Sequence, residues 1–227
     1  LLEYLDDTLK TPEDVRRALA TTVLGALPRH GGRDDGREIL AAVEHPLGPM
    51  AEAFRKLRTS IQFADLDRPI QTLLITSALP TDGKSFIAAN LATVIAQSGK
   101  SVILVDADLR HPVLHKAFGL SKTPGLVEAL LAVNEGRDPF APLQETQVPG
   151  LRVLTAGTHT PNPAEVLSSQ TFRHFVSELT EQVDFVIFDS PPVLAVTDAV
   201  VLSNLMDGTI MVIDYGVTRI LAAAQAM

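Results

Sequence analysis

The sequence contains no cysteine and no tryptophan, and aromatic residues make up only 5% of its 227 residues. The absence of cysteine excludes disulfide bonds and thiolate metal sites. No run of 18 or more apolar residues and no signal peptide is present, so the sequence predicts no membrane-spanning helix. The chain has 19 Lys and Arg against 27 Asp and Glu, and its formal charge of −8 argues against non-specific nucleic-acid binding.

Hydrophobic residues make up 46% of the chain, which is enough to fill the core of one sizeable α/β domain with an appendage. From residue 72 onward, short apolar runs alternate with stretches of helical periodicity. The alternation predicts a parallel sheet with helices on both faces. Strands are expected at residues 73–75, 102–105, 151–154, 185–188 and 209–213, and helices at about 85–98, 124–133, 163–182 and 196–205.

The first 45 residues are expected to lie outside the main domain. Thr11 followed by Pro12 and two acids is typical of a helix start, and this helix should run to about Ala20. A short helix is expected before it, and an extended segment or short strand at residues 23–28 after it. Glycine and charge are concentrated in residues 30–37, which is typical of a flexible linker. The predicted division is a helical segment (1–29), a linker (30–45) and the main domain (46–227), which begins with a helix at about 48–63.

A phosphate-binding loop is predicted at the end of the strand near residue 76. The following residues read Ala78-Leu79-Pro80-Thr81-Asp82-Gly83-Lys84-Ser85, and a helix begins at once. There, backbone N–H groups and the positive helix end can hold phosphate oxygens, Lys84 can reach the β- and γ-phosphates, and Ser85 can bind Mg²⁺. The alternative is an ordinary strand–turn–helix, since Ala78 stands where the general pattern has glycine. The expected nucleotide-binding residues are Thr81, Asp82, Gly83, Lys84, Ser85 and Phe86.

Carboxylates follow two of the other expected strands. Asp106 and Asp108 come after the run at 102–105, and Asp189 comes after the run at 185–188. Because ligands bind at the carboxyl ends of strands in open parallel sheets, the three carboxylates should converge on the phosphate loop. They could hold Mg²⁺ or accept a proton from an attacking hydroxyl. A solvated turn or a helix cap is the alternative for each motif alone, and the combination favours a P-loop NTPase-type site.

These motifs resemble those of the bacterial tyrosine kinases of polysaccharide export. That family carries a phosphate loop, a box of the form hhhDxDxR, and a box ending in DxPP. In this chain the second box ends at Arg110, and the third runs from Phe188 to Pro192. The resemblance covers about residue 46 to the C-terminus. Residues 1–28 resemble the juxtamembrane tail of polysaccharide chain-length regulators.

The resemblance implies an ATP- and Mg²⁺-dependent protein-tyrosine autokinase that regulates exopolysaccharide or capsule polymerisation and export. Lys84 would hold the phosphates, and Asp106 would be the base that deprotonates the acceptor tyrosine. Ser85, Asp108 and Asp189 would hold Mg²⁺.

The resemblance also implies a ring-like homo-oligomer, because Glu52, Arg55 and Arg58 are similar to the family's ExxRxxR oligomerisation helix. A solvated helix face is the alternative for these three residues. The chain would be the cytoplasmic domain of an inner or plasma membrane protein, held through upstream segments, with no nucleic-acid partner. Its acceptor would be a tyrosine tail on a neighbouring subunit. The two tyrosines here are Tyr4 and Tyr215, so either that tail is missing or the chain is not itself the main substrate.

Two other functions fit part of the pattern. A partitioning-type P-loop ATPase usually carries an extra lysine early in the loop, and this chain has Ala78, Leu79 and Pro80 there. A nucleotide-binding scaffold without kinase activity would not need intact Lys84 and three carboxylates. The family commonly has a basic residue near Asp214, so adenine recognition is expected to differ in detail.

Overall fold

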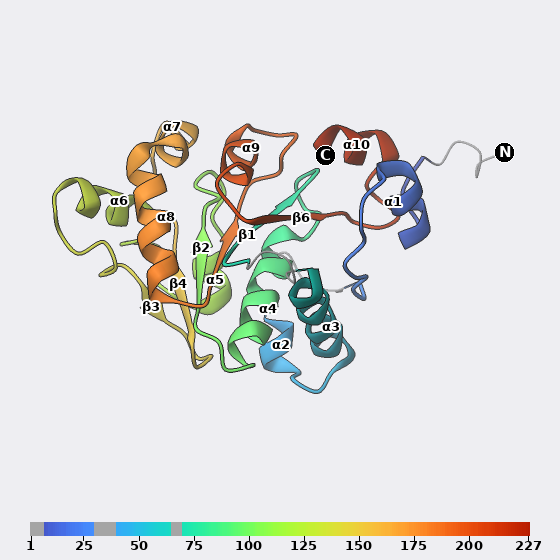
Figure 1. Cartoon of the computed structure of the whole chain (residues 1–227), viewed down its shortest axis with the longest axis horizontal. Helices are drawn as coiled ribbons and strands as arrows, with labels where there is room; N and C mark the ends of the chain where they lie inside the picture. The colour runs from blue at the N-terminus through green and yellow to red at the C-terminus, as the bar shows by residue number, and fades with distance from the viewer. Residues whose placement is uncertain (1–6, 30–39, 65–69) are drawn as a thin grey trace.

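The computed structural model describes residues 7–29, 40–64 and 70–227, and a six-stranded sheet of order β3-β4-β2-β5-β1-β6 forms its centre (Figure 1). All neighbouring strands pair in parallel except the edge pair of β3 and β4, which is antiparallel. The strands are β1 (Thr72–Ser77), β2 (Val102–Asp106), β3 (Gln144–Glu145), β4 (Leu151–Leu154), β5 (Phe185–Asp189) and β6 (Gly208–Val212).

Helices cover both faces of this sheet, as the alternating pattern predicted. Figure 1 shows α3 and α4 to one side of the strands and α6, α7 and α8 to the other. The helices of the described residues are α1 (Pro12–Leu19), α2 (Ala41–Glu44), α3 (Pro49–Ala64), α4 (Lys84–Ala96), α5 (Leu114–Phe118), α6 (Leu126–Asn134), α7 (Pro163–Ser168), α8 (Gln170–Gln182), α9 (Asp198–Ser203) and α10 (Ile220–Ala226).

The core divides into two clusters, one for each face of the sheet. Leu73 and Ile75 of β1 point into the cluster formed with α2, α3 and α4, whereas Leu74 points into the cluster formed with α6, α8 and α9. This split follows from the alternation of side chains along a strand. The central strands are buried on both faces, so their sequences are continuous apolar runs, and this made them visible in the sequence.

The strands and helices predicted from residue 11 onward are confirmed in the described residues, with some differences. The expected helix at 163–182 is two helices, because Ser169 has extended backbone and its side chain caps α8 by accepting the N–H of Phe172. The five-residue helix α5 and the polar two-residue strand β3 were not predicted. Of the two alternatives for residues 23–28, the short strand is not formed. At the end of the expected linker, residues 41–44 form α2, because Ala41 and Ala42 are buried and Ala42 N–H bonds to Asn90 Oδ1 at 2.8 Å.

The segment before residue 30 packs against the end of the chain. Thr11 caps α1 by accepting the N–H of Asp14 at 3.0 Å, as expected, and α1 lies beside α10 (Figure 1). Residues 1–6 and 30–39, which hold most of the first expected helix and of the expected linker, lie outside the described residues. The domain division therefore stays a prediction. Among the helices described, none combines the length and apolar character needed to cross a membrane.

Candidate active site

The predicted phosphate loop lies between β1 and α4 at the carboxyl edge of the sheet. Thr81 and Gly83 have φ of 71° and 90°, which curl the loop back on itself. Asp82 fixes this shape, because its Oδ2 accepts the N–H of Leu79 at 3.0 Å and its Oδ1 accepts the Thr218 hydroxyl at 3.2 Å. Lys84 opens α4. A helix start leaves its first amides without intrahelical acceptors, so the loop ends in a site suited to anions.

Lys84 is the cation at the centre of the site. Its Nζ lies 2.9 Å from Asp108 Oδ2 and 3.8 Å from Asp189 Oδ1, and it donates to Ser85 Oγ at 3.3 Å. Burial alone would lower the pKa of Lys84, but the carboxylates of Asp189 and Asp108 outweigh it and raise that pKa. The lysine is therefore charged and can pair with phosphate.

Asp106 is fully buried, and only one of its two carboxylate oxygens has a hydrogen-bond partner among the described residues. Its Oδ2 accepts the N–H of Leu114 at 3.0 Å, whereas its Oδ1 has no hydrogen-bond partner among the described residues. Burial raises the pKa of Asp106 well above its usual value, and the neighbouring carboxylate of Asp189 raises it further. A carboxylate with a raised pKa is a stronger base, and an oxygen without a hydrogen-bond partner is available to take a proton.

Asp189 is also fully buried, and in the described part of the chain neither of its oxygens has a hydrogen-bond partner. Burial raises its pKa to about 6, against the opposing effects of the Lys84 cation and the neighbouring Ser85 hydroxyl. Buried carboxylates normally find partners, since an unpaired one is costly. Oxygen atoms of this kind, beside the hydroxyl of Ser85, suit a hard cation such as Mg²⁺.

The other protein oxygens available to a metal are few. In the described residues no group of three or more His, Asp or Glu side chains is arranged to hold a metal ion. Mg²⁺ in phosphoryl-transfer sites is usually bound by one or two carboxylates, with water and substrate phosphates completing its shell. Ser85, Asp108 and Asp189 fit such an incomplete protein site.

Arg110, the last residue of the second box, pairs with a residue of α9. Its guanidinium pairs with both oxygens of Asp198, at 2.9 and 3.0 Å, and Asp198 is fully buried at the start of α9. The hydrogen bond to Asp198 raises the pKa of Arg110. Asp198 was not predicted as part of this region, because an acid in the first turn of a helix is common and carries no sign of its distant partner.

The expected oligomerisation residues lie together on α3, away from the carboxylates. Arg55 pairs with Glu52 at 3.1 Å and donates to the Pro46 carbonyl at 2.8 and 2.9 Å. Arg58 donates to the Val94 carbonyl of α4 at 3.0 Å. Both arginines therefore support packing within the chain, and Glu52 remains more exposed.

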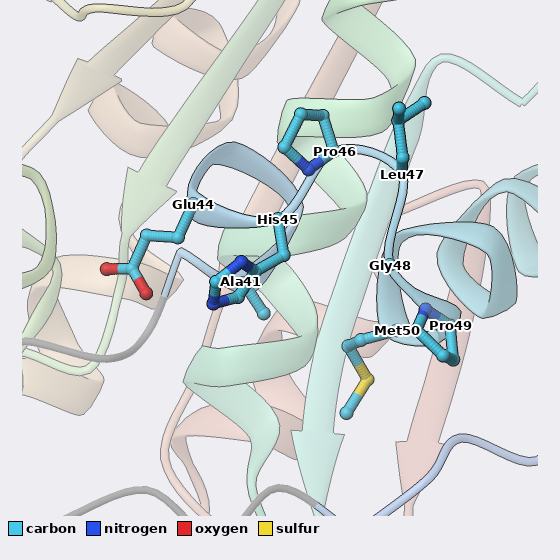
Figure 2. A pocket seen from close by; sticks show the side chains of 8 residues that line it. All are labelled: Ala41, Glu44, His45, Pro46, Leu47, Gly48, Pro49 and Met50. Carbon is cyan, nitrogen blue, oxygen red and sulfur yellow. The ribbon is translucent and has the colours of Figure 1, made fainter.

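Two shallow hollows flank this part of α3. One is lined by residues of the chain from α2 into α3, including Leu47, whose side chain is 94% exposed (Figure 2). The other is lined by Glu52, Arg55, Lys56, Arg58, Thr59, Ser60 and Phe63. Neither hollow includes a residue of the phosphate loop or of the carboxylate cluster.

The fold and the site define a P-loop nucleotide-binding protein. A ParA family model, described as NUBPL iron-transfer P-loop NTPase, matches residues 70–218. The septum site-determining protein MinD of Pyrococcus horikoshii, solved with Mg-ADP, shares the fold with a TM-score of 0.52 at 20% identity, covering 63% of this chain and 57% of that one.

More specific similarities narrow this class. The kinase domain of the Escherichia coli tyrosine kinase ETK superposes with a TM-score of 0.87 at 31% identity, covering 96% of this chain and 88% of that one. The tyrosine-protein kinase YwqD of Bacillus subtilis is 44% identical over 201 residues, which are 88% of this chain and 83% of YwqD. The chain belongs to the bacterial tyrosine-protein kinase family.

Other relatives are much longer than this chain. The tyrosine-protein kinase ptk of Acinetobacter johnsonii is 36% identical over 219 residues, which are 93% of this chain and 30% of ptk. The chain therefore corresponds to less than a third of that relative.

Proposed function

We propose that this chain transfers the γ-phosphoryl group of ATP to a protein tyrosine. The observation that carries the proposal is the buried cluster of Lys84, Asp106, Asp108 and Asp189 at the phosphate loop, in a chain of the tyrosine-kinase family. Besides the phosphate loop and the metal ligands, phosphoryl transfer needs a group that positions the attacking oxygen. The extra buried carboxylate at Asp106 supplies a group that can take a proton from a hydroxyl.

In the proposed reaction, backbone amides of residues 81–86 and Lys84 hold the β- and γ-phosphates. Lys84 now pairs with Asp108, so it exchanges a carboxylate for phosphate oxygens when nucleotide binds. Ser85, Asp108 and Asp189 would hold Mg²⁺, which when bound neutralises charge on the phosphates. Asp106 accepts the tyrosine proton. This role is supported by the burial of Asp106 and by its Oδ1, which has no hydrogen-bond partner among the described residues. Most of the rate arises from positioning and electrostatic stabilisation.

The proposed assembly is a homo-oligomeric ring that uses α3. Because Arg55 and Arg58 already bind carbonyls within the chain, Glu52 is the member of the trio best placed to reach a neighbour. The proposed setting is the cytoplasmic side of a bacterial membrane, with a role in exopolysaccharide or capsule production. One relative, 36% identical, is named a putative tyrosine-protein kinase in the cps region of Klebsiella pneumoniae.

The test is phosphorylation of a synthetic glutamate–tyrosine copolymer by the chain with ATP and Mg²⁺. We expect phosphotyrosine on the copolymer and ADP in equal amount. Release of ADP and inorganic phosphate with no phosphotyrosine would contradict the proposal and favour a partitioning-type ATPase. Omission of Mg²⁺ with EDTA present should abolish transfer.

A further inference from the structure

Few tyrosines in the chain could accept phosphate. The sequence has two tyrosines, Tyr4 and Tyr215, and Tyr4 lies outside the described residues. The side chain of Tyr215 is exposed, at 64% of its full surface. An exposed tyrosine in a tyrosine-kinase chain has the accessibility that an acceptor requires.

Tyr215 follows β6 at the same edge of the sheet as the phosphate loop. Strands β1 and β6 pair in parallel with Ser77 opposite Val212, so the chain leaves β6 beside the start of the loop. Three residues after the tyrosine, the Thr218 hydroxyl donates to Asp82 Oδ1 of that loop at 3.2 Å. Tyr215 is thus part of a turn that contacts the nucleotide-binding loop directly.

The backbone of this turn is held firmly. The Asp214 carbonyl accepts the N–H groups of Val217 and Thr218 at 3.1 and 2.8 Å. The turn also pairs with the N-terminal segment, because Gly216 N–H donates to the Leu9 carbonyl at 2.7 Å and Leu9 N–H donates to the Thr218 carbonyl at 3.1 Å. A side chain that is exposed on a fixed turn is presented at little additional cost in backbone entropy.

Arginines lie close to this turn. Arg29 pairs with Asp214 at 3.2 Å, and Arg219 pairs with Asp7 at 3.6 Å, while their side chains are 74% and 73% exposed. Exposed ion pairs of this kind are weak and exchange readily. Guanidinium groups bind phosphate well, so a phosphate on Tyr215 would have cationic partners nearby.

The turn and the carboxylate base of the same chain lie at different places along the edge of the sheet. The sheet order places β5 and β1 between β2, which ends at Asp106, and β6. At the usual strand spacing, three intervals amount to about 14 Å. Because the turn is fixed at that separation from Asp106, we take the phosphate donor to be bound to another copy.

We propose that Tyr215 is a phosphorylation site, modified by a second copy of the chain; this rests on the proposed kinase function. The bond between the γ-phosphorus and the bridging oxygen of ATP breaks, and a bond forms from Tyr215 Oη to that phosphorus. The hydroxyl proton passes to Asp106 of the other copy, and ADP leaves. The modification adds nearly two negative charges at the joint of the N-terminal segment and the phosphate loop.

The experiment separates the enzyme from the acceptor. The enzyme copy carries Tyr4→Phe and Tyr215→Phe, so it cannot be labelled on tyrosine. The acceptor copy carries Lys84→Met and an affinity tag that changes its size, in one version with Tyr4→Phe and in a second with Tyr215→Phe. Each mixture is incubated with ATP and Mg²⁺, and phosphotyrosine is measured by immunoblot and mapped by mass spectrometry. If Lys84→Met does not fold, Asp106→Asn takes its place in the acceptor.

We expect phosphotyrosine on the acceptor that retains Tyr215 and at least tenfold less on the acceptor that retains only Tyr4. Equal labelling of both, or labelling of the Tyr4 acceptor alone, would overturn the assignment. The glutamate–tyrosine copolymer in the same mixture distinguishes the causes of a negative result. Labelled copolymer with unlabelled Tyr215 refutes this site alone, whereas unlabelled copolymer refutes the proposed kinase function as well.

Discussion

Asp184 and Asp189, at the two ends of the sheet, differ in their hydrogen-bond partners, and their pKa values are shifted in opposite directions. At the amino end, Asp184 accepts the N–H and hydroxyl of Ser101, each at 2.8 Å, and pairs with Lys100 at 3.0 Å. These hydrogen bonds lower its pKa to about 2. At the carboxyl end, Asp189 is fully buried, the nearest cation is Lys84 Nζ at 3.8 Å from its Oδ1, and burial raises its pKa to about 6.

This difference in hydrogen bonding and pKa distinguishes carboxylates that hold the fold together from carboxylates that serve the site. Asp207, also at the amino end, uses one oxygen to accept both the N–H and the hydroxyl of Thr72 at 2.8 Å, and so ties β6 to β1. Asp106 and Asp189 gain no comparable satisfaction from the protein. Buried groups that remain unpaired cost stability and persist where a ligand or reaction uses them.

The largest expected effect comes from replacing the lysine that pairs with aspartate at the carboxyl end of the sheet, compared with the one at the amino end. Lys84→Met should reduce tyrosine phosphorylation about 100- to 1,000-fold, because the group that stabilises charge on the transferred phosphoryl is lost. It should also lower the free energy of unfolding by about 3–5 kcal/mol, because the carboxylates that it neutralises, Asp108 and Asp189, are buried. Transfer assays and urea unfolding measure the two changes.

Lys100→Met is the matched control. The Lys100–Asp184 pair is exposed, at 49% and 39% of the two side chains, whereas the Lys84–Asp108 pair is at 12% and 3%. Loss of an exposed pair should cost less than about 1 kcal/mol and leave transfer unchanged. Equal destabilisation by the two substitutions would contradict the difference between the ends.

Much of this arrangement was visible in the sequence. The buried strands are continuous apolar runs, so the parallel sheet and the positions of Asp106, Asp108 and Asp189 at strand ends followed from pattern and spacing. The short strand β3 was missed because Gln144 and Glu145 are polar and lie at the edge.

The partners of the charged residues were not visible. Arg110 pairs with a residue 88 positions away, and Arg58 binds a carbonyl 36 positions away. Such contacts cannot be predicted from the neighbouring sequence, because they form only when the helices pack on the sheet. The intrachain contacts of Arg55 and Arg58 on α3 were not visible for the same reason, since each donates to a carbonyl outside that helix.

The pH dependence of stability should differ in sign between the ends. The folded pKa of Asp189 lies above the unfolded value of about 3.9, so its contribution is present below about pH 4 and is lost as pH rises through about 6. The folded pKa of Asp184 lies below it, so its contribution is lost as pH falls from about 4 towards 2. The urea midpoint of the metal-free chain, measured in EDTA as a function of pH, reports the loss of stability on the acid side (the acid limb) and on the side of higher pH (the upper limb).

Substitution assigns each limb to its residue. Asp189→Asn should reduce the change between pH 4 and 6, to which Asp106 with its raised pKa also contributes, and should leave the acid limb. Asp184→Asn should flatten only the acid limb. An unaltered upper limb in Asp189→Asn would show that this carboxyl does not titrate where its burial requires.

The smallest expected effect concerns the contact between the turn after β6 and the phosphate loop. Thr218→Val removes the hydrogen bonds of a buried hydroxyl with Asp82 and with the Asp214 N–H while keeping the side-chain shape. It should lower stability by about 1–2 kcal/mol and weaken ATP binding by less than about tenfold. Thr209→Val, at an exposed position of β6, is the control and should change neither the melting temperature nor the Kd.

The most direct test compares Asp106→Asn with Asp207→Asn, each assayed for tyrosine phosphorylation and for the free energy of unfolding. Asp106→Asn should lower transfer at least about 100-fold while stability is unchanged or higher, because a buried acid becomes an amide that still accepts the Leu114 N–H. Asp207→Asn should lower stability by about 1–3 kcal/mol with transfer unchanged. Full activity in Asp106→Asn, or lost transfer without destabilisation in Asp207→Asn, would contradict the division between the two ends of the sheet.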